Sequence, residues 1–417
     1  MTAPKPSALP AYIAVTAAYW AFMLSDGALR MLVLLAFHER GFSPVQLAYL
    51  FLLYEIAGVI TNLSAGWLAA RFGLTRTLYA GLILQVGALL ALTALDPAWS
   101  IGASVAYVMA VQGASGVAKD LAKMSSKSAV KLLAPEGAGL LKWVSWLTGS
   151  KNAVKGLGFL LGAGLLALYG YNTALLGMAA ILALILVALL FFMPDGLPKG
   201  NKATKFSTVI SRDKNINRLS AARVFLFGAR DVWFVVGIPV YFYAVLSDGS
   251  DESRRAAFFM IGTFMAVWII FYGAVQAMAP RILRKGANDL GRLSASARQW
   301  ALALVPIPAL LAITVSTAGA PAPWLTVTLV LGLLVFGAIF AVNSALHSYL
   351  ILAFSKSERV SQDVGFYYMA NAAGRLLGTG LSGLAYQWGG VEACLMVASG
   401  FLALSAVAAN RLNCGRA

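Results

Sequence analysis

The sequence predicts an all-α membrane protein with twelve transmembrane helices in two pseudo-symmetric six-helix bundles and both termini in the cytoplasm. Of its 417 residues, 60% are hydrophobic and 12% are charged, whereas soluble proteins carry roughly 25% charged residues. The apolar residues form blocks long enough to cross a ~30 Å hydrocarbon layer as helices. In addition, the two halves of the chain resemble each other.

Twelve apolar segments can be drawn as spans. The polar segment between residues 194 and 217 is the longest connection, so it predicts a cytoplasmic linker between an N-terminal bundle, 1–193, and a C-terminal bundle, 218–417. The first apolar run continues through Asp26 to Phe37, which favours a membrane span over a cleaved signal peptide. The predicted spans are 11–37, 44–70, 74–95, 99–123, 140–169, 172–193, 218–246, 256–280, 297–316, 323–349, 361–388 and 391–409.

The loops on the two sides of these spans differ in charge. The chain has 32 Lys and Arg residues. Most of those that lie in loops fall on one side of the spans, while the loops on the other side carry only Arg40, Arg254 and Arg255. Cytoplasmic loops are enriched in Lys and Arg, so both termini are predicted to lie inside. The net charge of +16 is then mainly a topology signal, and no nucleic-acid partner is expected.

An internal repeat links the two halves. The pattern Phe-x₃-Asp occurs at Phe22 to Asp26 and again at Phe227 to Asp231. The segment NAVKGLGFLLGAG aligns with AAGRLLGTGLSG, which places Lys155 on Arg375 and Gly158 on Gly378. Two six-span halves joined by a basic loop are typical of the major facilitator architecture, which binds its substrate near the membrane midplane.

The predicted spans contain charged residues, which are costly in hydrocarbon and should face a wet cavity or a partner. Four acids, Asp26, Glu55, Asp120 and Asp231, are proton-coupling or ion-pair candidates. Spacing by four residues, which puts two side chains on one helix face, recurs in Asp26/Arg30, Lys119/Lys123, Lys151/Lys155, Asn343/His347 and Asn371/Arg375. The predicted substrate-binding residues are Arg30, Lys119, Lys123, Lys151, Lys155, Arg230, Asn343, His347, Asn371 and Arg375.

Several of these groups have a second interpretation. Asp26 and Arg30 are either a switchable pair or a structural brace, and Glu55 is either a proton carrier or the partner of a buried base. Arg230 and Asp231 are adjacent, so they are expected to point to different sides of their helix. The remaining groups near the cytoplasmic ends of their spans could instead extend to the lipid headgroups; these are Lys119, Lys123, Arg223, Asn343 and His347.

The sign of the intramembrane charge predicts an anionic substrate. Basic residues within the spans outnumber the acids, and Arg and Lys are the usual ligands of phosphate groups. With two histidines and two cysteines and no nucleophile, nucleotide or metal motif, the sequence predicts no catalytic residue, metal or cofactor, and a protein that is not an enzyme.

Glycines and one loop carry weaker motifs. Small residues four apart allow close helix contacts, which is the simplest role of the glycines in the fifth and eleventh spans. The loop GWLAARFGLTR resembles a major facilitator signature but has Ala70 where that signature has an acid. The glycines are Gly156, Gly158, Gly162, Gly164, Gly374, Gly378, Gly380 and Gly383.

Longer strings resemble one family within this architecture. LSDGALRMLVLLAFH, GVAKDLAKMSSKSAVKLL, LTGSKNAVKGLGFLLG and LSAARVFLFGARDVWFVVGIPVY closely resemble the ArsJ-type organoarsenical efflux permeases. The resemblance implies export of 1-arseno-3-phosphoglycerate, the ester that glyceraldehyde-3-phosphate dehydrogenase makes when arsenate replaces phosphate. It also implies a functional link to that enzyme, and a monomeric, multi-pass protein of the bacterial inner membrane that confers arsenate resistance.

The substrate and the driving force stay open at this stage. An antiporter for another phosphate ester or small organic anion would use the same cavity chemistry. Proton antiport, phosphate exchange and potential-driven transport are all compatible with the sequence. A membrane sensor would not need buried bases in both halves. An intramembrane enzyme would need a nucleophile, a metal or an acid–base pair of recognisable spacing, and the sequence has none.

Overall fold

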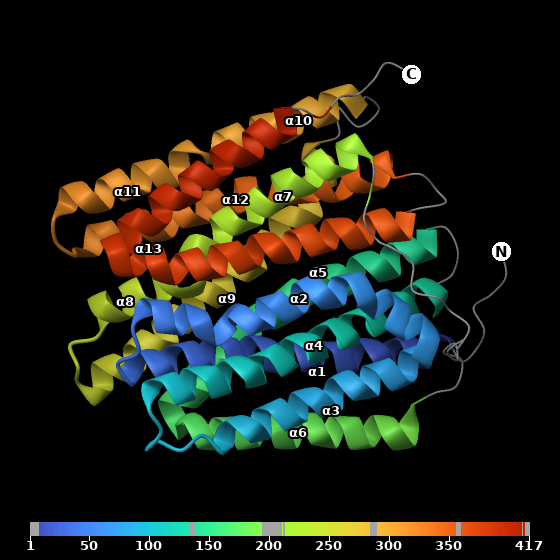
Figure 1. Ribbon diagram of the computed structural model, residues 1–417, viewed down its shortest axis with the longest axis horizontal. Coiled ribbons are helices and arrows are strands. Elements are labelled where there is room, and N and C mark those ends of the chain that lie inside the picture. The colour runs from blue at the N-terminus through green and yellow to red at the C-terminus, as the bar shows by residue number, and fades with distance from the viewer. Residues whose placement is uncertain are drawn as a thin grey trace. The chain divides into compact units, whose positions relative to one another are not determined.

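The computed structural model describes residues 8–133, 138–193, 211, 213–283, 290–355, 360–410 and 412, and these residues contain helices and no β-strand (Figure 1). The helices are α1 (Ala8–Glu39), α2 (Pro44–Phe72), α3 (Leu74–Thr93), α4 (Ile101–Leu133), α5 (Ala138–Tyr169), α6 (Tyr171–Phe192), α7 (Lys214–Val232), the π-helix η1 (Trp233–Gly237), α8 (Ile238–Leu246), α9 (Asp251–Ile282), α10 (Leu290–Leu304), α11 (Pro306–Ala318), α12 (Pro323–Phe354) and α13 (Val360–Asn410).

The helices follow the predicted spans closely. Among the described residues, eleven helical segments are long and apolar enough to cross a membrane. The last of them, α13, is broken by non-helical backbone at Gly389 and Gly390, and Figure 1 shows the chain reversing within it. Gly390 has a φ of 64°, which a residue with a Cβ rarely adopts. If the two arms of α13 are counted as separate spans, the chain crosses the membrane twelve times. That number stays a prediction.

Contacts divide the chain into two compact units. Unit 1 comprises Met1–Ala36, Ile60–Ser207 and Phe258–Ile269, and unit 2 comprises Phe37–Val59, Thr208–Ala257 and Ile270–Ala417. The first part of α2 therefore belongs to unit 2, and the middle of α9 belongs to unit 1. Most of the predicted linker at 194–217 lies outside the described residues, so the predicted boundary between two sequence halves stays a prediction.

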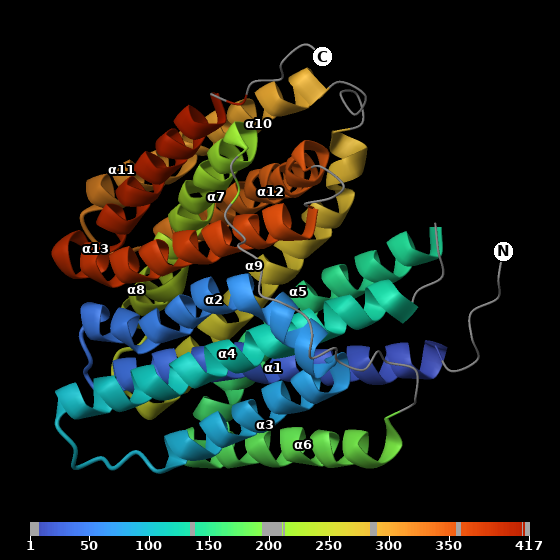
Figure 2. The same cartoon turned by 45° about the vertical axis from the view of Figure 1, so that its right-hand side comes forward.

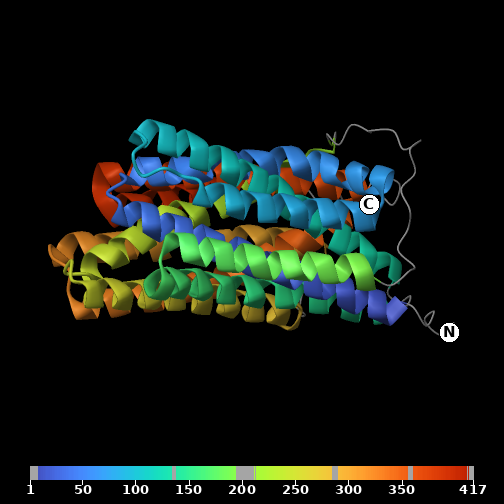
Figure 3. The ribbon, with the colours of Figure 1, turned by 90° about the horizontal axis from the view of Figure 1, so that it is seen from below.

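In unit 1, glycines on α5 let it approach the backbone of α1. A Cβ on Gly158 would lie 2.5 Å from the Leu24 carbonyl oxygen, and a Cβ on Gly162 would overlap the backbone of Ala28. On the other side of the unit, α3 packs against α4 and α6 (Figure 3). The predicted packing role of these two span-5 glycines is thus confirmed.

In unit 2, α13 and α7 make the corresponding contact. A Cβ on Gly374 would overlap the backbone of Val224, and one on Gly378 would lie 2.6 Å from the Gly228 carbonyl oxygen. Helices α10 and α11 also pack along α13 (Figure 2). The glycine-lined pair of α1 with α5 in unit 1 therefore corresponds to the pair of α7 with α13 in unit 2.

Two helix irregularities are stabilised from α13. Pro239 lacks an amide hydrogen and follows η1, and the Ser382 hydroxyl accepts hydrogen bonds from the amides of Val236 and Gly237 at 3.1 and 3.2 Å. Between α10 and α11, the Ser399 hydroxyl donates to the carbonyl oxygen of Val305 at 2.8 Å. These bonds satisfy backbone groups that a break in a buried helix would otherwise leave without a partner.

Candidate functional site

A buried acid–base pair lies at the glycine contact of unit 1. Lys155 Nζ on α5 donates to Asp26 Oδ2 on α1 at 2.9 Å, and the Asp26 side chain is 2% exposed. The sequence predicts a pairing of Asp26 with Arg30 on the same helix face, and the structure shows Lys155 as a partner of Asp26 from a different helix. Arg30 itself is partly buried on α1. The pair thus ties together two helices whose backbones touch through Gly158.

A second charged group in unit 1 surrounds Asp120 on α4. The fully buried Asp120 carboxylate accepts hydrogen bonds from Lys123 Nζ and Thr61 Oγ1, both at 2.5 Å. Lys123 Nζ also donates to Asn62 Oδ1 at 2.8 Å. Lys119, 7% exposed, is enclosed as well. Neither lysine extends freely to headgroups, because Lys123 is held by Asp120 and Asn62 and Lys119 is buried.

Unit 2 contains a larger ion-pair network. Asp231 on α7 binds Arg230 at 2.5 Å through Oδ1 and Arg375 at 3.3 Å through Oδ2. The Arg375 guanidinium also donates from Nη2 to Glu55 Oε1 on α2 at 2.6 Å. Glu55 is therefore the partner of a buried base, which was one of its two predicted roles.

The expectation that Arg230 and Asp231 point to different sides of α7 is wrong. Arg230 Nε donates to Asp231 Oδ1 at 2.6 Å, because the long arginine side chain bends back to its neighbour. Its guanidinium also lies over the rings of Phe227 and Phe340, at 4.8 and 5.7 Å from their centroids. Such cation–π contacts stabilise a cation away from water.

Arg223 forms a separate buried group on α7. It is 5% exposed, so the interpretation that it extends to the headgroups does not hold. Its Nε donates to Asn371 Oδ1 at 2.9 Å, and its Nη1 donates to both the backbone oxygen and the hydroxyl of Ser344 at 3.0 Å. The guanidinium stacks on Phe227 at 3.9 Å. No carboxylate forms an ion pair with Arg223 within the described residues.

Two polar side chains without partners in the described part of the chain lie on α12, the helix whose Ser344 bonds to Arg223. Asn343 and His347 on α12 are fully buried, and neither the Asn343 amide nor either His347 ring nitrogen has a hydrogen-bond partner in the described part of the chain. A buried polar group without a partner costs about 1–3 kcal/mol. Arg223 was not among the predicted site residues, although its four-residue spacing from Phe227 marks it on the sequence.

The predicted site residues thus fall into separate groups within each unit. Asp26 with Lys155 and Asp120 with Lys123 lie in unit 1. The network of Glu55, Arg230, Asp231 and Arg375 and the group of Arg223, Asn343, His347 and Asn371 lie in unit 2. Lys151 is partly buried one helical turn before Lys155 on α5.

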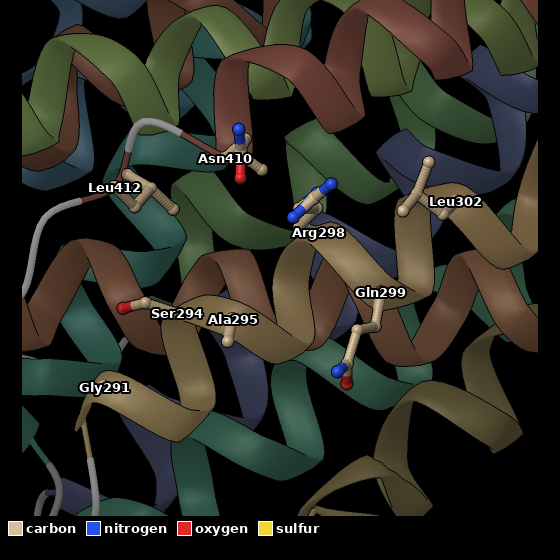
Figure 4. Close-up of a pocket in the computed structure, with 9 residues that line it drawn as sticks. Gly291, Ser294, Ala295, Arg298, Gln299, Leu302, Asn410 and Leu412 are labelled. Carbon is tan, nitrogen blue, oxygen red and sulfur yellow. The ribbon is translucent and has the colours of Figure 1, made fainter.

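A cavity of about 370 Å³ lies elsewhere in unit 2, between α10 and the end of α13. Figure 4 shows Arg298 on the side of α10 that faces Asn410, whereas Gln299 projects in another direction. None of the predicted site residues lines this cavity. Among the described residues, no three His, Cys, Asp or Glu side chains gather as metal ligands do.

Comparisons with known proteins agree with this architecture. Residues 15–351 match the model of the Major Facilitator Superfamily. The structure resembles the nucleoside transporter NupG, with a TM-score of 0.67 and 16% identity over 98% of this chain and 99% of the other. It also resembles a bacterial homologue of the iron transporter ferroportin in its inward-facing state, with a TM-score of 0.70 and 16% identity over 97% and 98% of the two chains.

No match was found among curated proteins. Identities this low show a shared fold and not a shared substrate. The family match covers most of the chain, and the helices are long and apolar enough to span a membrane. The protein therefore belongs to the major facilitator superfamily and is a multi-pass membrane transporter.

Proposed function

We propose that the protein exports an organoarsenical phosphate ester, 1-arseno-3-phosphoglycerate, from the bacterial cytoplasm by secondary active transport and so confers arsenate resistance. The observation that carries the proposal is the pair of repeat-related bases, Lys155 and Arg375, each partly buried at a glycine-lined helix contact beside an aspartate. The substrate has an anionic group at each end. The resemblance of the charged intramembrane strings to ArsJ-type permeases supplies the specific substrate.

Each base is held by a carboxylate that an arriving anion would have to displace. In unit 1, Asp26 neutralises Lys155 at 2.9 Å. In unit 2, Asp231 and Glu55 share Arg375. A buried charge without its partner is costly, so an anion that takes over the base favours protonation of the released carboxylate. Exchange of a carboxylate for substrate anion thereby couples binding to proton uptake.

Substitution of Asp26 tests this coupling. Asp26→Asn leaves Lys155 without the carboxylate 2.9 Å away, so the variant should still bind the anion and should lose the pH dependence of transport. Everted vesicles assayed between pH 6 and 8 give the measurement. A charge swap, Asp26→Lys with Lys155→Asp, is the control. Normal pH-dependent export by the swapped protein would mean that the pair only braces α1 against α5.

The substrate itself can be tested by reconstitution. Everted vesicles receive arsenate, glyceraldehyde-3-phosphate, NAD⁺ and glyceraldehyde-3-phosphate dehydrogenase, and each component is then left out in turn. Arsenic should accumulate only when all four are present. Equal accumulation with arsenate alone would refute the proposed substrate.

A transporter of another phosphate ester or small organic anion is the alternative, because the same buried bases would serve it. The two are distinguished by competition in the same vesicles. Under the proposed function, 3-phosphoglycerate competes weakly, since its far end carries a carboxylate where the proposed substrate carries a tetrahedral arsenate group. Transport of labelled 3-phosphoglycerate at an equal rate would favour the alternative.

A further inference from the structure

Arg223 differs from the other buried bases of unit 2. Arg230 and Arg375 both contact carboxylates, whereas Arg223 is held by an amide oxygen, a backbone oxygen, a hydroxyl and an aromatic ring. These neutral contacts orient the guanidinium and leave its charge uncompensated. A purely structural arginine in an apolar span would be expected to carry a counter-charge, as its neighbours do.

The donors of this group also remain partly unused. The second terminal nitrogen of Arg223, Nη2, donates to none of the described residues. The Asn343 amide and the His347 ring are fully buried, and within the described residues they have no hydrogen-bond partner. Asn343 and His347 share one face of α12, and Ser344, which follows Asn343, bonds to Arg223. One charge on α7 and two sets of neutral polar atoms on α12 therefore lie on the two helices that the bond between Arg223 and Ser344 joins.

We propose that Arg223, Asn343 and His347 form a subsite for a tetrahedral oxyanion, the phosphate or arsenate group at one end of the transported ester. This inference rests on the proposed function, because it requires an anionic substrate. It adds a second set of binding residues to the Asp26–Lys155 and Asp231–Arg375 pairs. The guanidinium supplies charge and a planar fork that matches an oxyanion. The Asn343 NH₂ group and the protonated ring nitrogen of His347 supply further donors, which would satisfy both side chains.

Asn371 provides a sharp test, because its Oδ1 accepts from Arg223 Nε at 2.9 Å. Asn371→Asp is nearly isosteric and places a permanent carboxylate against the guanidinium. That internal anion should compete with a bound one. Arg223→Lys is the second variant, since it keeps the charge and loses the fork. Arg298→Gln is the matched control, because it removes one arginine from the same unit at an exposed position on α10.

The experiment measures binding of inorganic phosphate and of inorganic arsenate to the purified full-length protein in lipid nanodiscs by calorimetry. Thermal unfolding shows in parallel that each variant is folded. The dissociation constant should rise at least tenfold in Asn371→Asp and several-fold in Arg223→Lys, and Arg298→Gln should match the wild type. The two anions distinguish the ends of the ester, because the end that occupies the subsite should bind more tightly.

Wild-type affinity in Asn371→Asp would overturn the subsite. If that variant does not fold, Arg223→Lys decides in the same way. Because the probes are inorganic anions, the result does not depend on which ester is transported. If the protein binds the inorganic anions but no arsenical accumulates in vesicles, the proposed substrate is rejected and the subsite is kept. If export is normal and both variants bind the anions as the wild type does, the subsite is rejected and the proposed substrate is kept.

Discussion

The aspartate pairs of α1 with α5 and of α7 with α13 have the same framework but different electrostatics. In both, a glycine lets the helix backbones touch, an aspartate lies on the first helix, and a base lies on the second. Lys155 bonds to Asp26, whereas Arg375 contacts two carboxylates and Asp231 contacts two guanidinium groups. The repeat has preserved the helix contact, while the charge around it has diverged.

This difference predicts that the two units respond unequally to loss of their base. The Lys155–Asp26 bond joins two helices, α1 and α5. A guanidinium that spans two carboxylates holds three helices, α2, α7 and α13, at one point. Unit 2 should therefore lose more folding stability than unit 1 when the base is removed, although export should fail in both cases.

The largest expected effect follows from truncating each base. Arg375→Ala removes the guanidinium that Glu55 and Asp231 share, and it should cost about 3–5 kcal/mol of folding stability, as breaking a buried pair does. Lys155→Ala affects one carboxylate and should cost less. Thermal unfolding of the purified variants gives the comparison, and Glu55→Gln added to Arg375→Ala should restore part of the loss. A more severe defect in Lys155→Ala would contradict the proposed difference.

Exchanging the two base types sharpens the same comparison. Arg375 bonds to Glu55 through Nη2 and to Asp231 through Nε, whereas the lysine of Arg375→Lys has one nitrogen. The variant should therefore lose about 1.5–3 kcal/mol of folding stability, the contribution of one hydrogen bond to a charged group. Lys155→Arg keeps a cation beside Asp26 and should lose less. Denaturant titration of both variants provides the measurement. Equal losses would show that the partner number of the base does not matter.

The glycines should respond alike in the two units, because the repeat preserves the helix contact. Gly162→Ala and Gly374→Ala each place a methyl group against backbone atoms of the neighbouring helix, and overpacking of this kind costs about 1–3 kcal/mol. Gly87→Ala on α3 and Gly177→Ala on α6 are matched controls, since nothing lies near a Cβ at either position. Thermal midpoints of the four variants test this, and variants at Gly162 and Gly374 as stable as the controls would refute the close contact.

The smallest expected effect concerns the starts of α2 and α9, which are repeat-related. Ser43 and Gln46 cap α2 without charge. Before α9, hydrogen bonds from Ser253 and Ser250 lower the pKa of Asp248 to about 2. Because this pKa lies below that of the unfolded chain, the stabilisation is present above about pH 4 and is lost as the pH falls towards 2. Protection of the amides at the start of α9 from hydrogen exchange, taken relative to their intrinsic exchange rate at each pH, should fall over that range, and Asp248→Asn should remove the dependence. An equal fall in protection at α2 would contradict it.

The sequence predicted the helices and the repeat because both depend on local information. Apolar block length defined the spans, and Gly158 and Gly378 aligned through their neighbours. Partners in different helices depend on tertiary packing, so four-residue spacing favoured Asp26 with Arg30 and gave no information on Lys155, 129 residues away. Arg223 was missed for a related reason. Its position near the end of a span suggested contact with headgroups, and only the packing of α12 and α13 shows it enclosed.

The hydroxyl of Ser382 has a consequence for how the chain is made. It accepts from the amides of Val236 and Gly237, 146 and 145 residues earlier in the chain. At 5–20 residues per second, synthesis needs on the order of 10 s to reach it. The irregular turn of η1 thus enters the bilayer before its acceptor exists. The span that carries Asp231 is completed only when α13 arrives, which makes the second half of the chain a late-maturing unit during membrane insertion.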